Sequence, residues 1–278
     1  MFARALELYP AAMMHAVWFL SNHYTLLATF PDVAVMSAFM NFVNGNLAKE
    51  LGRLYGWKEK FWSRRYRAIE LVDPGRGPAR LKYLLSQGSK EGLVARPCDW
   101  PGVSSLRTLL EGVPLLGVWF DRTTEYRARR RKMEFEPRDF ARVIPIPHTP
   151  LPCWSDLSEE DHRARVREIV DQIEEEAKAR NAALRRKPLG AAVILRQNPH
   201  DHPANFVKTP APLVHASTRD RFLEYCRRYY EFVIAFREAA DRLKAGIFEA
   251  LREFPDGCFP PRPPCRLATG PAAQSAGG

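Results

Sequence analysis

The chain has 278 residues, of which 46% are hydrophobic and 11% aromatic, which is enough for one large domain or two small ones with real cores. Its five cysteines are scattered and form no CxxC pair, which argues against a disulfide framework or a zinc knuckle and fits a reducing cytoplasm. The sequence has neither a signal-peptide pattern nor an apolar run of about 18 residues, so we expect neither secretion nor a membrane span.

Positive charge is concentrated in one part of the chain. The formal net charge is +10 at pH 7, and residues 49–132 contain 19 Lys and Arg against 9 Asp and Glu, whereas the rest is balanced at 23 against 23. A local positive field favours a polyanionic partner, most often nucleic acid. An anionic membrane surface is the rival, but this window contains no basic amphipathic helix with a wide apolar face.

The N-terminal residues predict a short helix followed by two strands. The helix covers residues 2–8 and ends at a proline, and apolar residues 14–19 form the first strand. The second strand places His23 and Thr25 on one face and Tyr24 on the other, because side chains alternate along a strand. Such a polar pair is typical of a metal at a sheet surface or of a half-buried strand with a polar edge, and the strand by itself favours the latter.

A long helix and an arginine-rich segment follow. The helix runs from an N-cap at Asp32 to Gly56, and its stripe of Met and Phe residues is expected in the core. Residues 61–72 form a loop leading into a strand, with aromatic side chains among arginines. This mixture is typical of base stacking and phosphate contacts, and equally of a sheet with an arginine-rich solvent face.

The next segment contains a tyrosine and a glutamine one helical turn apart. After a turn at residues 73–78, residues 79–86 predict a short helix whose leucines face the core. Tyr83 falls just off this buried stripe, so its phenol can reach a surface groove, and Gln87 lies beside it. Taken without other information, Tyr83 is more simply a surface tyrosine that covers the sheet.

Patterns after residue 100 predict irregular structure and then helices. Residues 109–120 contain two glycines and a proline and predict turns against the core. A basic cluster at residues 127–132 is typical of a solvated face or of a phosphate contact, and the prolines that follow predict an extended linker. Two long amphipathic helices, capped by Ser158 and Thr218, are expected to form a hairpin that packs on itself or on the first domain.

Several of these segments together resemble the REP-associated tyrosine transposases, a branch of the HUH single-strand DNA transposases. The matching segments come in the family's order and at similar spacing, over about the first 110 residues. Two features depart from the family: the second histidine of its His-hydrophobic-His motif is Thr25 here, and the family's first strand is missing. The segments are Asn22-His23-Tyr24, Phe61–Tyr66, Leu81–Gln87, Lys90–Val94 and Trp100–Ser105.

The resemblance implies a site and a reaction. Tyr83 would be the catalytic nucleophile, forming a 5′-phosphotyrosyl intermediate with single-stranded or hairpin DNA. His23, Gln87 and the degenerate Thr25 would hold Mg²⁺ or Mn²⁺ in a weakened site, and an amide oxygen suits these hard ions. The expected DNA-binding residues are Arg64, Arg65, Tyr66, Arg67, Lys82, Arg129, Arg130 and Arg131.

The fold class expected is α/β (α+β), with a ferredoxin-like antiparallel sheet that lacks its first strand and a helical C-terminal region. An exposed sheet edge would allow a homodimer, and the location expected is cytoplasmic and nucleoid-associated. A non-catalytic DNA-binding protein and a helical protein-interaction module are the alternatives. The domains predicted are a transposase-like domain at 1–120, a basic and Pro-rich linker at 121–156, a helical region at 157–256 and a disordered tail at 257–278.

Overall fold

A computed structural model describes residues 1–201 and 212–262 of the chain. It is a mixed α/β structure that divides into two compact units, residues 1–215 and residues 216–278. None of the helices in the described ranges combines the length and apolar character that a membrane-spanning helix requires. The elements of the first unit are α1 (Phe2–Leu8), β1 (Met13–Phe19), β2 (Tyr24–Thr29), α2 (Val33–Tyr55), β3 (Glu70–Leu71), α3 (Gly77–Lys90), α4 (Leu106–Glu111), β4 (Leu115–Phe120), α5 (Arg122–Arg130), β5 (Ala141–Ile146), α6 (Glu159–Ala183), α7 (Ala191–Ile194) and β6 (Val214–His215).

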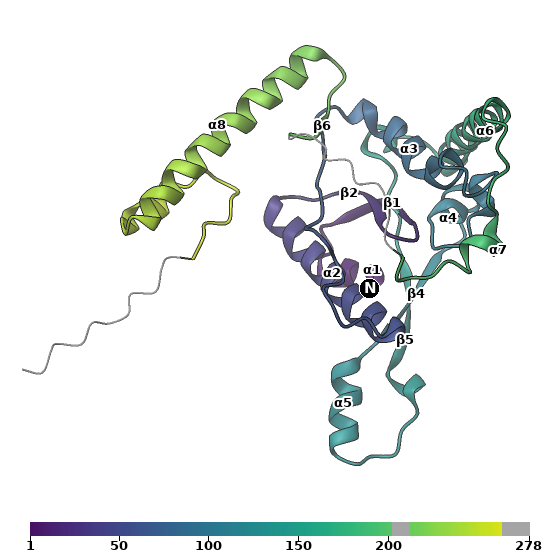
Figure 1. The fold of residues 1–278 in the computed structure, drawn as a ribbon, viewed down its shortest axis with the longest axis horizontal. Helices are drawn as coiled ribbons and strands as arrows, with labels where there is room; N and C mark the ends of the chain where they lie inside the picture. Colours follow the sequence, from purple (N-terminus) through teal and green to yellow (C-terminus); the bar gives the residue numbers. More distant parts are fainter. Residues whose placement is uncertain (202–211, 263–278) are drawn as a thin grey trace, which may run out of the picture. The chain divides into compact units, whose positions relative to one another are not determined.

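The antiparallel hairpin of β1 and β2 lies at the centre of the first unit, with helices on both faces (Figure 1). Tyr24 and Leu26 point to one face and join a core with α1 and α2. Leu27 points to the other face and joins a core with α3, α4 and α6. The alternation predicted from the sequence therefore separates two hydrophobic cores across one thin hairpin.

Helix α2 begins and ends where the sequence predicts. The side chain of Asp32 accepts a hydrogen bond from the backbone N–H of Val35 at 2.7 Å, which satisfies one of the free donors of the first turn. Gly56 ends the helix with φ +63°, a left-handed conformation that glycine adopts without steric cost. Phe39 and Val43 on the predicted apolar stripe are buried.

The segment at 109–120 differs from the predicted turns, because it contains the end of α4 and all of β4. Gly112 ends α4 with φ +72°. Gly117, however, lies within β4 beside α1, where an added Cβ would be 2.9 Å from the Cβ of Ala3. Its small size permits close packing of helix on strand, and a sequence pattern does not distinguish that role from a turn.

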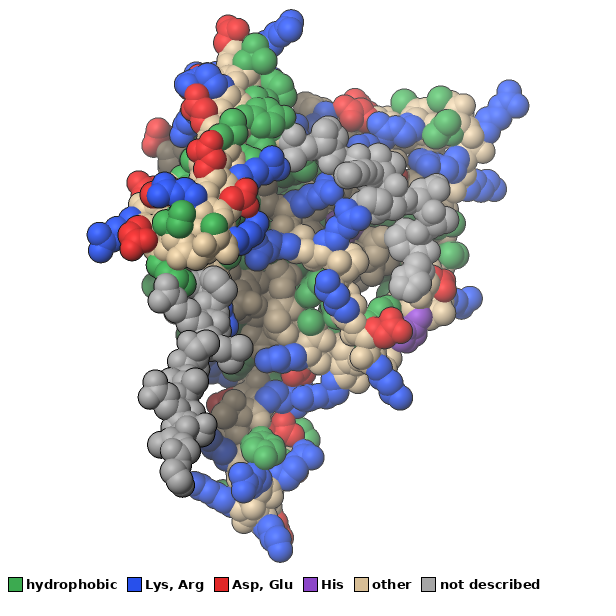
Figure 2. Space-filling model, turned by 60° about the vertical axis from the view of Figure 1, so that its left-hand side comes forward, with side chains coloured by type: hydrophobic (Ala, Val, Ile, Leu, Met, Phe, Trp, Pro, Cys, Tyr) green, Lys and Arg blue, Asp and Glu red, His purple; other side chains and the backbone are tan. Residues whose placement is uncertain are grey.

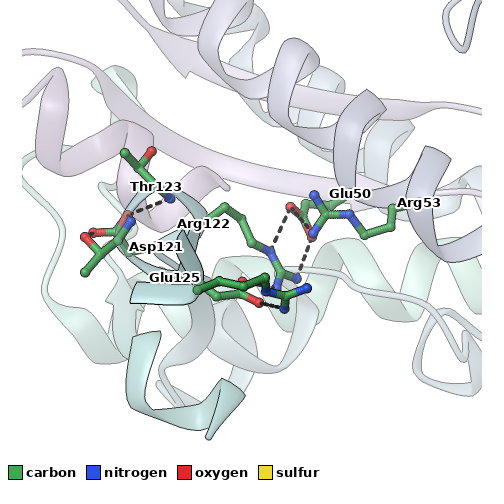
Figure 3. Close-up of polar contacts among 8 residues, drawn as sticks. Glu50, Arg53, Asp121, Arg122, Thr123 and Glu125 are labelled. Atoms are coloured by element: carbon green, nitrogen blue, oxygen red, sulfur yellow. Dashed lines mark hydrogen bonds and ion pairs between the residues drawn. The ribbon is translucent and has the colours of Figure 1, made fainter. Parts of the chain in front are cut away.

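The segment at 121–156 contains ordered structure in place of an extended linker. Strand β5 pairs with β4 along its whole length, and Pro145 lies opposite Leu116. A proline is tolerated there because each strand of this two-stranded sheet is an edge strand. The basic cluster begins in α5, which connects the two strands; Arg122 joins it to α2 through paired bonds to Glu50 of 2.9 and 3.2 Å (Figure 3).

Helix α6 starts as predicted and packs on the first domain, one of the two surfaces that the sequence left open. Ser158 accepts a hydrogen bond from the N–H of Asp161, and the predicted apolar face is buried. That face lies against α3 and α4 of the first unit. Its apolar residues share a core with the buried leucines of α3, and the sequence does not reveal which of the two candidate surfaces a helix covers.

The second unit contains α8 (Arg219–Lys244) and a 3-10 helix, η5 (Phe248–Arg252). Thr218 caps α8 by accepting a hydrogen bond from the N–H of Arg221 at 3.3 Å, as predicted. Phe236 packs edge-on against Phe254 with ring centroids 5.2 Å apart. Most of the predicted disordered tail, residues 263–278, lies outside the described residues.

The outer edge of β1 is covered by two other segments. Phe19 donates a backbone hydrogen bond to Val103, and Ser105 bonds to Val17 through both its backbone and its hydroxyl. Thr149 donates to the carbonyl of Met14 at 2.8 Å. The exposed edge that was expected beside a missing strand is therefore closed on this side. The edge of β2 has no strand partner among residues 1–201 and 212–262.

His15 binds the covering segment that contains Thr149, and it makes the stability of the fold depend on pH. Its ring is 3% exposed, with Nδ1 2.9 Å from the carbonyl oxygen of Thr149 and Nε2 2.8 Å from the hydroxyl of Thr29. Burial lowers the pKa of His15, so the unfolded chain takes up a proton before the folded one does. Its contribution to stability is complete above about pH 6.5 and is lost as the pH falls.

We therefore predict that the free energy of unfolding falls with acidification below about pH 6.5. In the His15→Gln variant this free energy should fall less steeply. The two slopes should differ by up to about 1.4 kcal/mol per pH unit. Urea denaturation of both proteins at a series of pH values gives the slopes. Parallel curves would contradict the role assigned to His15.

Candidate active site

His23 lies in the tight turn between β1 and β2, directly before β2 begins. The backbone N–H of Leu20 donates to the carbonyl of His23 at 2.8 Å, which continues the ladder of the hairpin by one residue pair. Leu20 contacts the core on the α3 face. Because residues opposite one another in an antiparallel ladder share a face, the backbone directs His23 to the side of the hairpin that α3 covers.

The imidazole of His23 is arranged to accept on one nitrogen. Its Nδ1 lies 2.7 Å from Oδ1 of Asn22, and this amide oxygen can only accept, so Nδ1 carries the proton. The lone pair of the neutral ring is therefore on Nε2, as a metal ligand requires. The residue is exposed, yet surrounding atoms remove enough water to lower its pKa, which favours the neutral form.

Thr25 and Gln87 are in direct contact. The Nε2 atom of Gln87 donates to Oγ1 of Thr25 at 3.0 Å, joining α3 to β2. Thr25 lies opposite Trp18, and both face the core on the α3 side. The structure thus brings together two of the three predicted metal ligands, from positions 62 residues apart in the sequence.

The carbonyl oxygen of Gln87 is buried without a partner. The residue is 7% exposed, and its Oε1 accepts no hydrogen bond from any described residue. Leaving such an acceptor unpaired costs about 1–3 kcal/mol. An amide oxygen of this kind is a suitable ligand for Mg²⁺ or Mn²⁺, so the donor set of Gln87 and His23 fits such an ion. Among residues 1–201 and 212–262, no group of three His, Cys, Asp or Glu side chains is arranged to hold a metal.

Tyr83 is accessible and surrounded by positive charge. It is 46% exposed and lies on α3 one turn before Gln87. The ammonium of Lys90 is 5.0 Å from the centre of its ring, and the guanidinium of Arg80 is 5.9 Å away. These cations are placed to attract a phosphate toward the phenol. His23 makes no hydrogen bond to Thr25, Tyr83 or Gln87 in the described structure.

The arginine-rich loop before β3 divides into a buried and an exposed part. Arg64, Arg65 and Arg67 are exposed, as a phosphate contact requires. Tyr66 instead packs against the core on the α2 face. Trp62 anchors the loop there by donating to the backbone carbonyl of Asn44 at 2.9 Å. The predicted aromatic stacking surface is thus partly used by the fold itself.

Other predicted DNA contacts are held in ion pairs. Lys82 lies 2.7 Å from Glu176 of α6, and Arg129 lies 3.0 Å from Glu125 within α5. Arg130 and Arg131 are exposed. Lys and Arg side chains predominate around α5, at the bottom of Figure 2. The positive charge of the 49–132 window is therefore distributed over at least three elements, the loop before β3, α3 and α5.

Sequence reasoning missed three neighbours of the site. Asn22 orients His23, and its adjacency in the sequence was the available signal. Arg80 is one turn before Tyr83, so helical spacing would have identified it. Arg180 of α6 lines a pocket with Tyr83, and only tertiary packing brings the two together.

The Thr25–Gln87 contact predicts a strong energetic coupling. Thr25→Val removes the acceptor and leaves the buried Nε2 of Gln87 unpaired, which should destabilise the fold by about 1–3 kcal/mol. Adding Gln87→Leu removes the unpaired amide and should recover most of the loss. Urea denaturation of the two single variants and the double variant measures the coupling, and additive losses would contradict the contact.

Comparison with known proteins finds no matching family model, no matching curated protein and no matching solved structure.

Proposed function

We propose that this protein is a HUH-type DNA transposase that cleaves and rejoins single-stranded or hairpin DNA through Tyr83. One observation carries the proposal: Gln87 reaches from α3 to Thr25 on β2, one turn from the exposed phenol of Tyr83, and its buried oxygen bonds to no described residue. This arrangement joins the two sequence segments in which the family resemblance places the nucleophile and the ligands. The resemblance suggests the reaction, and the contact supports a site for it between α3 and β2.

In this proposal the hydroxyl oxygen of Tyr83 attacks the phosphorus of a phosphodiester. A bond forms between the phenolic oxygen and phosphorus, and the bond to the 3′ oxygen breaks, so that the phenolic proton ends on the released 3′ hydroxyl. Lys90 and Arg80 draw the phosphate toward the phenol and offset its negative charge. His23 and Gln87 would hold Mg²⁺ or Mn²⁺, which when bound neutralises charge on the non-bridging oxygens.

Thr25 makes the proposed site a weak one. Its hydroxyl stands where the family has an imidazole, and it already accepts the hydrogen bond of Gln87. Loss of a ligand should weaken metal binding by at least the 10–100-fold typical of changes in the groups around the ligands. The same observation favours the alternative of a DNA-binding protein that has lost the chemistry. The exposed apolar residues of α8, such as Tyr230 and Ile234, favour a protein-interaction role only for the second unit.

The proposal also includes the finer fold and setting. The hairpin of β1 and β2, with α2 and α3 on its two faces, would correspond to part of a ferredoxin-like sheet lacking its first strand. A homodimer would then form along the edge of β2. A DNA-acting protein of this kind would work in the cytoplasm at the nucleoid.

A covalent trap tests the chemistry. The full chain, incubated with Mn²⁺ and a single-stranded oligonucleotide containing a hairpin, should form an adduct that survives denaturation and maps to Tyr83. Tyr83→Phe should abolish the adduct, because only the attacking oxygen is removed. Tyr126→Phe is the matched control, since Tyr126 is 59% exposed and lies on α5.

The trap separates the three functions. An adduct that persists in Tyr83→Phe contradicts the proposed nucleophile. DNA binding that weakens with salt but never yields an adduct supports the non-catalytic alternative. Failure to bind DNA even at low salt leaves the interaction role of the second unit.

Replacement of the degenerate ligand provides a second test. Thr25→His supplies the missing imidazole and should raise the Mn²⁺-dependent rate of adduct formation at least tenfold. Thr25→Val is the control, because it removes the hydroxyl without adding a ligand. Rates measured by quenching the reaction at successive times decide the matter, and an unchanged rate for Thr25→His would mean that β2 is not part of a metal site.

A further inference from the structure

A pocket between α3 and α6 is lined by Tyr83 and extends to Arg180 of α6, which has no role in the chemistry above. Its volume is about 280 Å³, and both helices belong to the first unit. Ile173 and Ala177 of α6 form its apolar floor, and Tyr83 contributes an aromatic wall. The polar rim is formed mainly by cations: Arg80, Lys82, Lys90 and Arg180.

One of these four cations is neutralised within the pocket. Lys82 pairs with Glu176, the acidic residue of the lining, at 2.7 Å. Lys90 and Arg180 have no carboxylate partner in the part of the chain that the structure describes. The pocket therefore retains positive charge beside an apolar floor, where an anion is attracted more strongly than in open water.

The third cation of the rim, Arg80, is held in place by a hydrogen bond to His215. Its Nη1 lies 3.0 Å from Nε2 of His215. Burial, and then the positive charge of Arg80, lower the pKa of His215, so the ring is neutral and can accept this bond. The contact with His215 fixes the position of the Arg80 guanidinium, and a guanidinium with a fixed position is suited to a phosphate oxygen.

We propose that this pocket binds, through Arg180, the phosphodiester group of a nucleic-acid strand next to the one that Tyr83 attacks, while Arg80 and Lys90 on the same rim face the attacked group. The inference rests on the proposed function for the identity of the strand. The mixed lining supports a nucleotide rather than a small anion, because a nucleotide presents a charged phosphate and a flat apolar base together. Helix α6 lies beyond the first 110 residues, so it extends the DNA site past the segments that resemble the transposase family.

Binding of a fluorescent single-stranded oligonucleotide tests the pocket. In a Tyr83→Phe background, which keeps the ring but prevents cleavage, Arg180→Ala should reduce the salt slope of log K by about 0.7, the value for one lost phosphate contact on a single strand. A salt concentration of about 0.1 M is tenfold below 1 M, so a slope that is smaller by about 0.7 lowers the affinity there about fivefold. Arg167→Ala is the matched control, since Arg167 is an exposed arginine of the same helix outside the pocket.

The outcomes distinguish this inference from the function on which it rests. If Arg180→Ala and Arg167→Ala affect binding equally, the pocket proposal fails, even if the Tyr83 adduct forms. If Arg180→Ala alone weakens binding and no adduct forms, the pocket stands and the proposed chemistry fails. Competition by inorganic phosphate as effective as competition by the oligonucleotide would identify a free-anion pocket and overturn the strand assignment. Circular dichroism confirms that the variants are folded.

Discussion

The two-residue period of β2 determines where the rest of the first unit can lie. Tyr24 and Leu26 belong to the core with α2, whereas Leu27 belongs to the core with α3. Because a shift of the register by one residue would exchange the two faces, the helices of both cores depend on the pairing of β2 with β1. The same alternation directs Thr25 to Gln87 and gives Tyr24 a hydrogen bond to Asn44 on α2. The two hydrophobic cores and the candidate site therefore depend on the same register of β2 against β1.

A hairpin of two strands is at best marginally stable by itself, and the chain compensates for this. The backbone at 103–105 bonds to β1, and Trp100 donates from its indole to the carbonyl of Phe19 at 2.8 Å. Trp100 also stacks on Trp18, with ring centroids 6.2 Å apart. These contacts cover one edge and one end of the hairpin, so the turn that contains His23 is held beside packed aromatic rings rather than projecting freely.

Local sequence patterns predicted the helix ends better than they predicted which elements pack or pair with one another. The caps at Asp32, Ser158 and Thr218 are side-chain effects on adjacent backbone, and each was predicted correctly because the sequence contains the whole interaction. The β4–β5 pairing and the packing of α6 on α3 depend on contacts far apart in the sequence. In the segments that form β4 and β5, prolines and glycines predict a linker and turns, but Pro145 lies in an edge strand and Gly117 makes room for Ala3.

The burial of Gln87 is the strongest argument that the α3 face does more than pack. Leucines occupy the neighbouring buried positions of α3, and a leucine would satisfy position 87 with no polar group left unpaired. Instead an amide is buried with its Nε2 bonded and its Oε1 without a described partner, an arrangement that costs stability. A fold that only needed a core would not require this oxygen. Its place beside Thr25, one turn from an exposed tyrosine with cations around its ring, is where a ligand for the oxygen would meet a nucleophile.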